Sequence, residues 1–209
     1  MDGILLAMKP LNFNTALKKG AVGEAIVSDY LYSKNLMIFK SERENCSHPF
    51  DKMLVDMETL KFVGLVDVKT KPKRVYYPDT GIDLRHWHTY LDASRINKVP
   101  FFLFFVDEEM GKIFWGELEY LSQERMVDGL KYPRKEFGKK AIVYFPISVM
   151  KVLDRDISQQ NANLIRSFSQ RSYDYINQNS LFLQGQTQTI TQSSEEWIKA
   201  CISEHFLCP

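Results

Sequence analysis

The sequence predicts an α/β sandwich in which helices cover a mixed central sheet. Three observations support this fold class. Residues 22–31 repeat apolar side chains at helical spacing, residues 62–69 form a β-prone run, and residues 100–106 are apolar throughout. A continuous apolar run is typical of a strand buried on both faces, and such a strand needs a covering layer on each side.

The first element is an amphipathic helix. Apolar residues recur at four-residue spacing in two series, Val22, Ile26 and Tyr30, and Val27 and Leu31. This spacing places them on one side of a helix. Gly20 and Gly23 each cost a helix interior up to about 1 kcal/mol relative to Ala. Two glycines therefore indicate close approach by a strand or a ligand backbone, unless they reflect helix flexibility or chance.

A β-hairpin follows the helix. Residues 51–56 and 62–69 read as two antiparallel strands joined through a Met-Glu-Thr turn. Such a pair can bring Asp51 and Asp67 close together. On the second strand, Asp67 and Lys69 share one face while Val66 and Val68 share the other, because successive side chains alternate. The sequence predicts that the two valines enter a core.

The later elements follow from turn and capping residues. Asp83 is a good N-cap for a helix, and Pro146 closes a strand. The expected elements are a loop at 75–82, a helix from Asp83 to about Arg95, a strand at 100–106, its hairpin partner at 113–118 after a turn at 107–112, a strand at 141–145, and a helix at 158–176 with Leu164, Ile165, Phe168 and Tyr175 on one side.

The C-terminal stretch differs in composition. Residues 177–194 are rich in Gln, Asn, Ser and Thr, which is typical of a flexible linker. The stretch at 195–209 places Trp197, Ile198, Cys201 and Ile202 on one helical face. We therefore expect a domain at 1–176, a linker, and an amphipathic helix. This helix packs on its own domain, crosses to a second subunit, or binds a protein partner.

Composition narrows the class of protein. The 27 Lys and Arg against 26 Asp and Glu give a net charge of only +1, so any DNA-binding surface must come from local clustering. Cys46, Cys201 and Cys208 have neither an even count nor metal-ligand spacing, which favours a reducing compartment. Because no apolar run reaches membrane-spanning length and no signal-peptide pattern is present, we expect a cytoplasmic protein without a membrane partner.

The most informative residues are Asp67 and Lys69. A carboxylate and an ammonium side by side on one strand face suit a divalent metal next to a phosphate, although an exposed ion pair is the simpler interpretation of Asp-x-Lys alone. Two more carboxylates precede this strand, namely Glu24 on the first helix and Asp51 in Pro-Phe-Asp.

In this order, a Gly-x-x-Gly-Glu helix, Pro-Phe-Asp on a hairpin, and Asp-Val-Lys on its second strand, the chain resembles the PD-(D/E)xK nuclease superfamily over about residues 14–106. The superfamily includes archaeal Holliday junction resolvases and many repair and phage nucleases. The resemblance implies a restriction-endonuclease-like α/β/α sandwich around a mixed central sheet, to which the helix expected at 195–209 adds a C-terminal extension. Two departures are Phe50 between Pro49 and Asp51, and Asp rather than Glu at position 67.

The resemblance also implies residue roles. Asp51, Asp67 and the carbonyl of Val68 would be ligands of Mg²⁺ or Mn²⁺, which prefer hard oxygen donors. Glu24 would hold a metal-bound water or help with a second ion. Lys69 would position or help deprotonate the attacking water and offset phosphate charge.

Several basic and aromatic residues are candidates for DNA contact. The cluster Lys71, Lys73 and Arg74 follows the motif strand, and Arg85, His86 and Tyr90 lie on the next helix. A second basic cluster at 131–140 reads equally well as a solvated loop. The helix that carries Arg85, His86 and Tyr90 lacks the Gln that several nuclease families of the superfamily have at the equivalent place. Trp87 and Leu91 read as core residues, and a histidine-based metal site lacks further ligands.

We therefore expect a metal-dependent endodeoxyribonuclease, acting as a homodimer because two strands must be cut. The competing hypothesis is an inactive nucleic-acid- or partner-binding protein that retains the fold, which near-neutral charge favours. RNA as the substrate of the same chemistry also stays open, because nothing in the sequence reads the 2′-hydroxyl.

Overall fold

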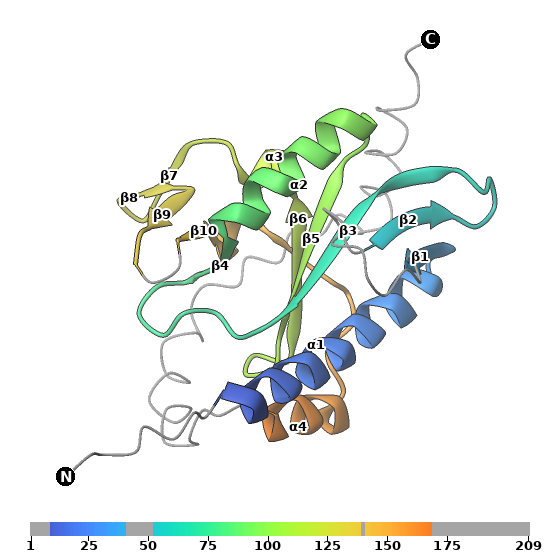
Figure 1. The fold of residues 1–209 in the computed structure, drawn as a ribbon, viewed down its shortest axis with the longest axis horizontal. Coiled ribbons are helices and arrows are strands. Elements are labelled where there is room, and N and C mark those ends of the chain that lie inside the picture. The colour runs from blue at the N-terminus through green and yellow to red at the C-terminus, as the bar shows by residue number, and fades with distance from the viewer. Residues whose placement is uncertain (1–8, 41–51, 139–140, 169–209) are drawn as a thin grey trace.

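Helix α1 (Lys9–Tyr32) covers one face of a six-stranded sheet (Figure 1). The computed structural model describes residues 9–40, 52–138 and 141–168. The predicted amphipathic character of α1 is confirmed, since Val27, Tyr30 and Leu31 are buried. None of the helices within these ranges has the length and apolar character needed to cross a membrane.

The central sheet is mixed. Its strands, in spatial order, are β1 (Leu36–Lys40), β2 (Lys52–Asp56), β3 (Phe62–Thr70), β5 (Phe101–Asp107), β6 (Lys112–Glu117) and β11 (Lys151–Val152). β3 and β5 are parallel, and every other neighbouring pair is antiparallel. The predicted hairpins β2–β3 and β5–β6 are confirmed, with a bulge in β2 between Leu54 and Val55. β5 is buried along its whole length, as its apolar sequence predicts.

Helices cover both faces of this sheet. α1 and α4 (Gln159–Ser167) lie on one face, and α2 (Leu84–Asn97) with the short α3 (Leu118–Leu121) lies on the other. The parallel pair β3–β5 requires a crossover connection, and α2 is its helix. The predicted α/β sandwich around a mixed sheet is confirmed. Its order of elements is consistent with the restriction-endonuclease-like fold that the motifs imply.

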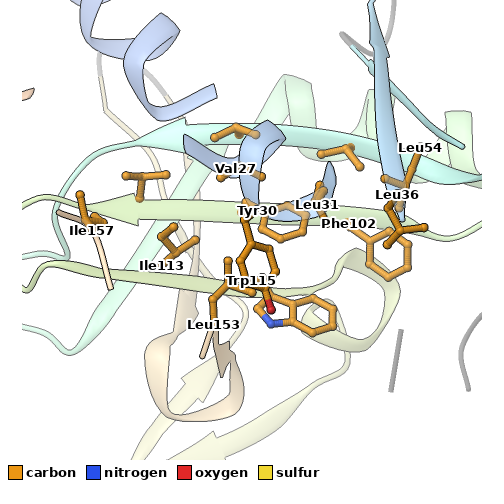
Figure 2. Close-up of a cluster of buried hydrophobic side chains, with 14 of the residues drawn as sticks. Val27, Tyr30, Leu31, Leu36, Leu54, Phe102, Ile113, Trp115, Leu153 and Ile157 are labelled. Atoms are coloured by element: carbon orange, nitrogen blue, oxygen red, sulfur yellow. The ribbon is translucent and has the colours of Figure 1, made fainter. Parts of the chain in front are cut away.

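Each face of the sheet has its own core. Figure 2 shows the α1 side, where Val27, Tyr30 and Leu31 lie over Phe102 and Trp115 of the strands. On the other side, side chains of α2 and α3 pack against Leu65, Leu103 and Phe105. At about 25 cal/mol per Å² of apolar surface, two such clusters dominate the favourable free energy of folding.

A smaller, three-stranded sheet lies next to α2. It consists of β4 (Asp79–Asp83), β10 (Ile142–Pro146) and β9 (Arg134–Glu136), in that order. The remaining short elements are β7 (Arg125–Val127), β8 (Leu130–Tyr132) and the 3-10 helix η1 (Ile147–Val149). Ile82, Val143 and Phe145 of the small sheet join the core on the α2 side. The two sheets therefore share one apolar layer.

Three expectations need correction. The loop expected at 75–82 is wrong at its end, because residues 79–83 form β4 by pairing with β10. Asp83 precedes α2 as expected, but its side chain makes no capping hydrogen bond. The helix expected at 158–176 ends at Ser167 instead, and Leu164 is 43% exposed whereas Ile165 is buried. Tyr175 and the predicted linker and helix at 177–209 lie outside the described residues.

Candidate functional site

Asp67 and Lys69 form an ion pair on the central strand β3. The Lys69 Nζ atom lies 3.1 Å from Oδ1 and 2.9 Å from Oδ2 of Asp67. Val66 and Val68 enter the core, as predicted, and this core is the one on the α1 side, so the pair faces α2. Asp67 is only 1% exposed whereas the Lys69 side chain is 27% exposed. The ammonium therefore compensates the charge of the buried carboxylate, while it reaches solvent itself.

Aromatic side chains of α2 border the pair. The Lys69 ammonium lies 5.9 Å from the centre of the Tyr90 ring, within range of a cation–π interaction. The Tyr90 ring is stacked with His86 and with Phe101. His86 and Tyr90 are four residues apart and share a helix face, as predicted. The structure therefore places Tyr90 next to the Asp67–Lys69 pair, with His86 stacked on Tyr90.

Lys71 continues the same face of the chain beyond β3. Its ammonium donates a hydrogen bond to the carbonyl of Gly81 on β4. Burial lowers the pKa of Lys71 to about 8, and the positive charge of Lys69 adds to the lowering. The carboxylates of Asp83, Asp67 and Asp79 oppose this shift. Two lysines and a buried carboxylate thus share a small volume at the end of β3.

Glu24 lies on the opposite side of β3. Its Oε2 atom is 2.7 Å from Nζ of Lys52, whose side chain is 4% exposed. Lys52 pairs with Val66 across the β2–β3 ladder and therefore shares the α1 face with it. Within the described ranges, no group of three or more His, Cys, Asp or Glu side chains is arranged so that it could hold a metal ion, and Glu24 and Asp67 belong to no such group.

Close approach of α1 to β3 explains one of the two glycines. A Cβ atom on Gly23 would lie 1.9 Å from Oγ1 of Thr70, so only glycine allows this contact. A Cβ atom on Gly20 would meet nothing within 4 Å. The prediction of close approach by a strand is confirmed for Gly23, the residue directly before Glu24. Among the described residues, none comes this close to Gly20.

The remaining predicted DNA-contacting residues have different surroundings. Arg74 makes a bidentate ion pair with Asp79 and a second with Glu136, and its guanidinium lies 3.6 Å from the Tyr144 ring centre. The Lys73 amide donates to Asp107, whereas the Arg85 side chain is exposed. Arg74 therefore fastens the segment before β4 to the small sheet.

Asp107, the last residue of β5, holds three backbone amides. Its carboxylate accepts hydrogen bonds from Lys73, Glu109 and Met110, each at 2.9 Å. Burial nevertheless raises the pKa of Asp107 to about 6, because it is 1% exposed and the three hydrogen bonds offset the desolvation only in part. Asp107 thereby ties the segment after β3 to the turn after β5.

Asp51, the first acidic residue of the predicted motif, lies outside the described residues, as do the three cysteines. The described part of the site therefore contains Asp67, Lys69, His86 and Tyr90 together, with Glu24 separate.

The sequence analysis did not predict a role for Lys52 or Asp79. An available signal for Lys52 was its place on a strand whose alternation points it inward with Leu54. Asp79 offered no local signal.

No protein-family model matches the chain, and a comparison with curated proteins gives no match. Among solved structures, the chain is similar to Hjc, a Holliday junction resolvase from the archaeal hyperthermophile Archaeoglobus fulgidus. The superposition has a TM-score of 0.40 and 8% sequence identity, and it covers 61% of this chain and 84% of that chain. Similarity of this extent does not identify the activity of this chain.

Proposed function

We propose that the chain is a metal-dependent endodeoxyribonuclease that hydrolyses phosphodiester bonds of DNA. The observation that carries the proposal is the Asp67–Lys69 ion pair, in which a carboxylate that is 1% exposed meets a lysine that reaches solvent. A buried carboxylate is costly unless it is paired, and next to a cation that reaches solvent it suits a metal ligand beside a phosphate-binding lysine.

The donor types fit Mg²⁺ or Mn²⁺. Carboxylate and carbonyl oxygens are the ligands that these ions prefer. Asp67 and the carbonyl of Val68 would hold the ion with Asp51, whereas Glu24, which is paired with Lys52 on the opposite side of β3, does not lie next to Asp67. Asp51 directly precedes Lys52, and Lys52 pairs with Val66, the residue before Asp67. This register supports a site shared by Asp51 and Asp67. A bound Mg²⁺ would supply Lewis acidity to the phosphate.

The chain's own side chains would orient the substrate. Lys69 lies next to Asp67 and keeps 27% of its side chain exposed, so its ammonium is available to a phosphate and to the attacking water. His86 and Tyr90 border this position. Lys71, Lys73, Arg74 and Arg85 remain proposed DNA contacts, among which Arg85 is the most accessible. Phosphate contacts of this kind fix position rather than sequence.

A homodimer would cut both strands of a duplex. Sedimentation of the protein at micromolar concentration tests this proposal, and a monomer throughout would contradict it. The 195–209 helix is a candidate for a subunit or partner contact.

The second candidate is a binding protein without activity. It is favoured by the ion pairs of both described carboxylates, Asp67 with Lys69 and Glu24 with Lys52, because each negative charge is already balanced within the chain. Near-neutral net charge also agrees with it. Such a protein would shift DNA in a gel and leave it intact.

Nicking of supercoiled plasmid separates the two candidates. The wild-type chain is incubated with Mg²⁺ or Mn²⁺ beside D67A and K69A, with DNA binding measured in the same buffers. The proposed function predicts nicking by the wild type that both substitutions abolish while the protein stays folded. The matched control is D154A, because the Asp154 side chain is also paired with a lysine, Lys34, but is 56% exposed.

Unchanged nicking by D67A or K69A would refute the assigned site. Binding without nicking by the wild type would support the second candidate. An RNA of the same sequence, tested in parallel, decides which nucleic acid is cut.

A further inference from the structure

Two basic segments that are far apart in the sequence, residues 71–77 and 131–137, lie together at the small sheet. Arg74 is 2.6 Å from Glu136 in an ion pair, and the Arg134 guanidinium lies 4.5 Å from the centre of the Tyr77 ring. In Figure 1 the first segment leads from β3 into β4, and β9 of the second belongs to the same small sheet. We call these two segments the small-sheet surface.

Positive charge is concentrated on the small-sheet surface. Its two segments contain six lysine and arginine residues and one acid, Glu136, whereas the whole chain has a net charge of only +1. Glu136 is ion-paired with Arg74 and Arg134. Two acids outside the segments also pair with these cations, namely the buried Asp79 and the exposed Glu124. Cations still exceed these acids by six to three, so the small-sheet surface is complementary to a polyanion.

Aromatic rings are interleaved with these cations. The Arg74 guanidinium lies 3.6 Å from the ring centre of Tyr144 and 4.6 Å from that of Tyr77. Two further rings reach far into solvent, since Tyr76 is 83% and Phe137 is 77% exposed. Tyr76 directly precedes Tyr77, and Phe137 ends the second segment. Exposed rings next to cations that are held in place are suited to stacking on a flat anionic partner.

This combination favours unpaired DNA over a duplex. In a duplex each base lies between its neighbours, so a protein reaches only the phosphates, the sugars and the base edges. An unpaired base exposes its flat face, on which an aromatic side chain stacks, while lysines and arginines follow the phosphates. A duplex would engage the cations of the small-sheet surface, but it would offer no base face to Tyr76 and Phe137.

The small-sheet surface is continuous in the chain with the candidate site. Lys69 and Arg74 are five residues apart, so their Cα atoms are separated by at most about 18 Å. Between them, the Lys71 ammonium donates a hydrogen bond to the Gly81 carbonyl of β4. This contact fastens the connecting segment to the small sheet. DNA bound at the small sheet would therefore lie close to the Asp67–Lys69 pair.

We propose that the small-sheet surface binds unpaired DNA, with Tyr76 and Phe137 stacking on bases and Lys73 and Lys135 contacting phosphates. This inference rests on the proposed function in taking DNA as the substrate, and it adds the form of DNA that is recognised. The substrate is then a DNA with a single-stranded stretch next to the position that is cut.

The test measures the fluorescence anisotropy of a labelled oligothymidylate of about 16 nucleotides, a length that spans known single-strand sites, and of the same strand annealed to its complement. The full-length protein is used in EDTA, so binding is recorded without cleavage. We expect the wild type to bind the single strand more tightly than the duplex. Y76A and F137A should each weaken single-strand binding by about fivefold or more and leave duplex binding unchanged. Y32A is the matched control, because Tyr32 is 61% exposed at the end of α1.

Salt dependence tests the two lysines. K73A and K135A should each reduce the slope of log affinity against log salt concentration for the single strand by about 0.7, the value for one phosphate contact. K61A is the matched control and should keep the slope, because Lys61 is exposed and precedes β3, whereas the segment 71–77 follows it. Thermal melts of all variants confirm that they are folded.

The inference is overturned if the wild type binds the duplex as tightly as the single strand, if it binds neither, or if Y76A and F137A bind the single strand as Y32A does. Nicking of plasmid by the wild type together with any of these results leaves the proposed function standing and removes only the small-sheet surface. Loss of single-strand binding in Y76A and F137A, without nicking by the wild type, supports the small-sheet surface and refutes the nuclease.

Discussion

Substitution of Gly23 by Ala tests the contact that seats α1 on β3. The new Cβ atom would lie 1.9 Å from Oγ1, 3.0 Å from Cβ and 3.1 Å from Cγ2 of Thr70. Rotation of the Thr70 side chain can move Oγ1 away, but the Cβ contact persists unless the helix moves. Overpacking of this kind costs about 1–3 kcal/mol.

Helix propensity acts in the opposite direction and must be separated from the overlap. Ala is favoured over Gly by up to about 1 kcal/mol in a helix interior. G20A gains this propensity without a clash, because nothing lies within 4 Å of its Cβ position. The difference between the two variants therefore isolates the overlap, and we expect G23A to be less stable than G20A by about 1–3 kcal/mol.

Urea unfolding measures the free energies, since midpoints at equal slope report stability directly. T70A removes Oγ1 and Cγ2, so we expect G23A/T70A to recover more than half of the loss relative to T70A alone. Equal unfolding free energies for G20A and G23A would refute the close approach of α1 to β3. Failure of T70A to relieve G23A would place the strain at another residue.

Two further substitutions test the segments that frame the site. Burial raises the pKa of Asp107 from 3.8 to about 6, so its stabilising contribution is complete below pH 3.8 and is lost as the pH rises through 6. Between these limits the wild-type unfolding free energy should fall by about 3 kcal/mol more than that of D107N in urea titrations, and parallel pH profiles would contradict this. R74K loses the bidentate ion pair with Asp79, and we expect a loss of about 1–3 kcal/mol with faster amide exchange in β9 and β10. Unchanged exchange there would mean that Arg74 does not fasten the small sheet.

Local sequence patterns were sufficient to predict the main helices and strands. The apolar spacing of α1, the alternation in β3 and the continuous apolar run of β5 each reflect contacts that a periodic element makes along its whole length. Such patterns can be recognised in the sequence even when the segments that pack against the element are not known. For the same reason the shared face of Asp67 and Lys69 was predictable, because alternation along a strand fixes it.

Elements that depend on distant partners were not predictable. β4 has the turn-like sequence Asp-Thr-Gly-Ile, and it becomes a strand because β10, about 60 residues later in the chain, supplies its hydrogen bonds. The helix at 158–176 was predicted too long, since α4 ends at Ser167. Arg74, predicted as a DNA contact, is held by Asp79 and Glu136 in the fold.

The sequence by itself determined the layers of the fold and the types of side chain at the candidate site, because burial periodicity and residue chemistry are local properties. Only the tertiary structure decided which charges meet. The ion pair of Glu24 with Lys52 and the close approach of Gly23 to Thr70 depend on where α1 crosses the sheet. That crossing is set by the packing of the cluster on the α1 side, whose members come from distant segments of the chain, and no short segment encodes it.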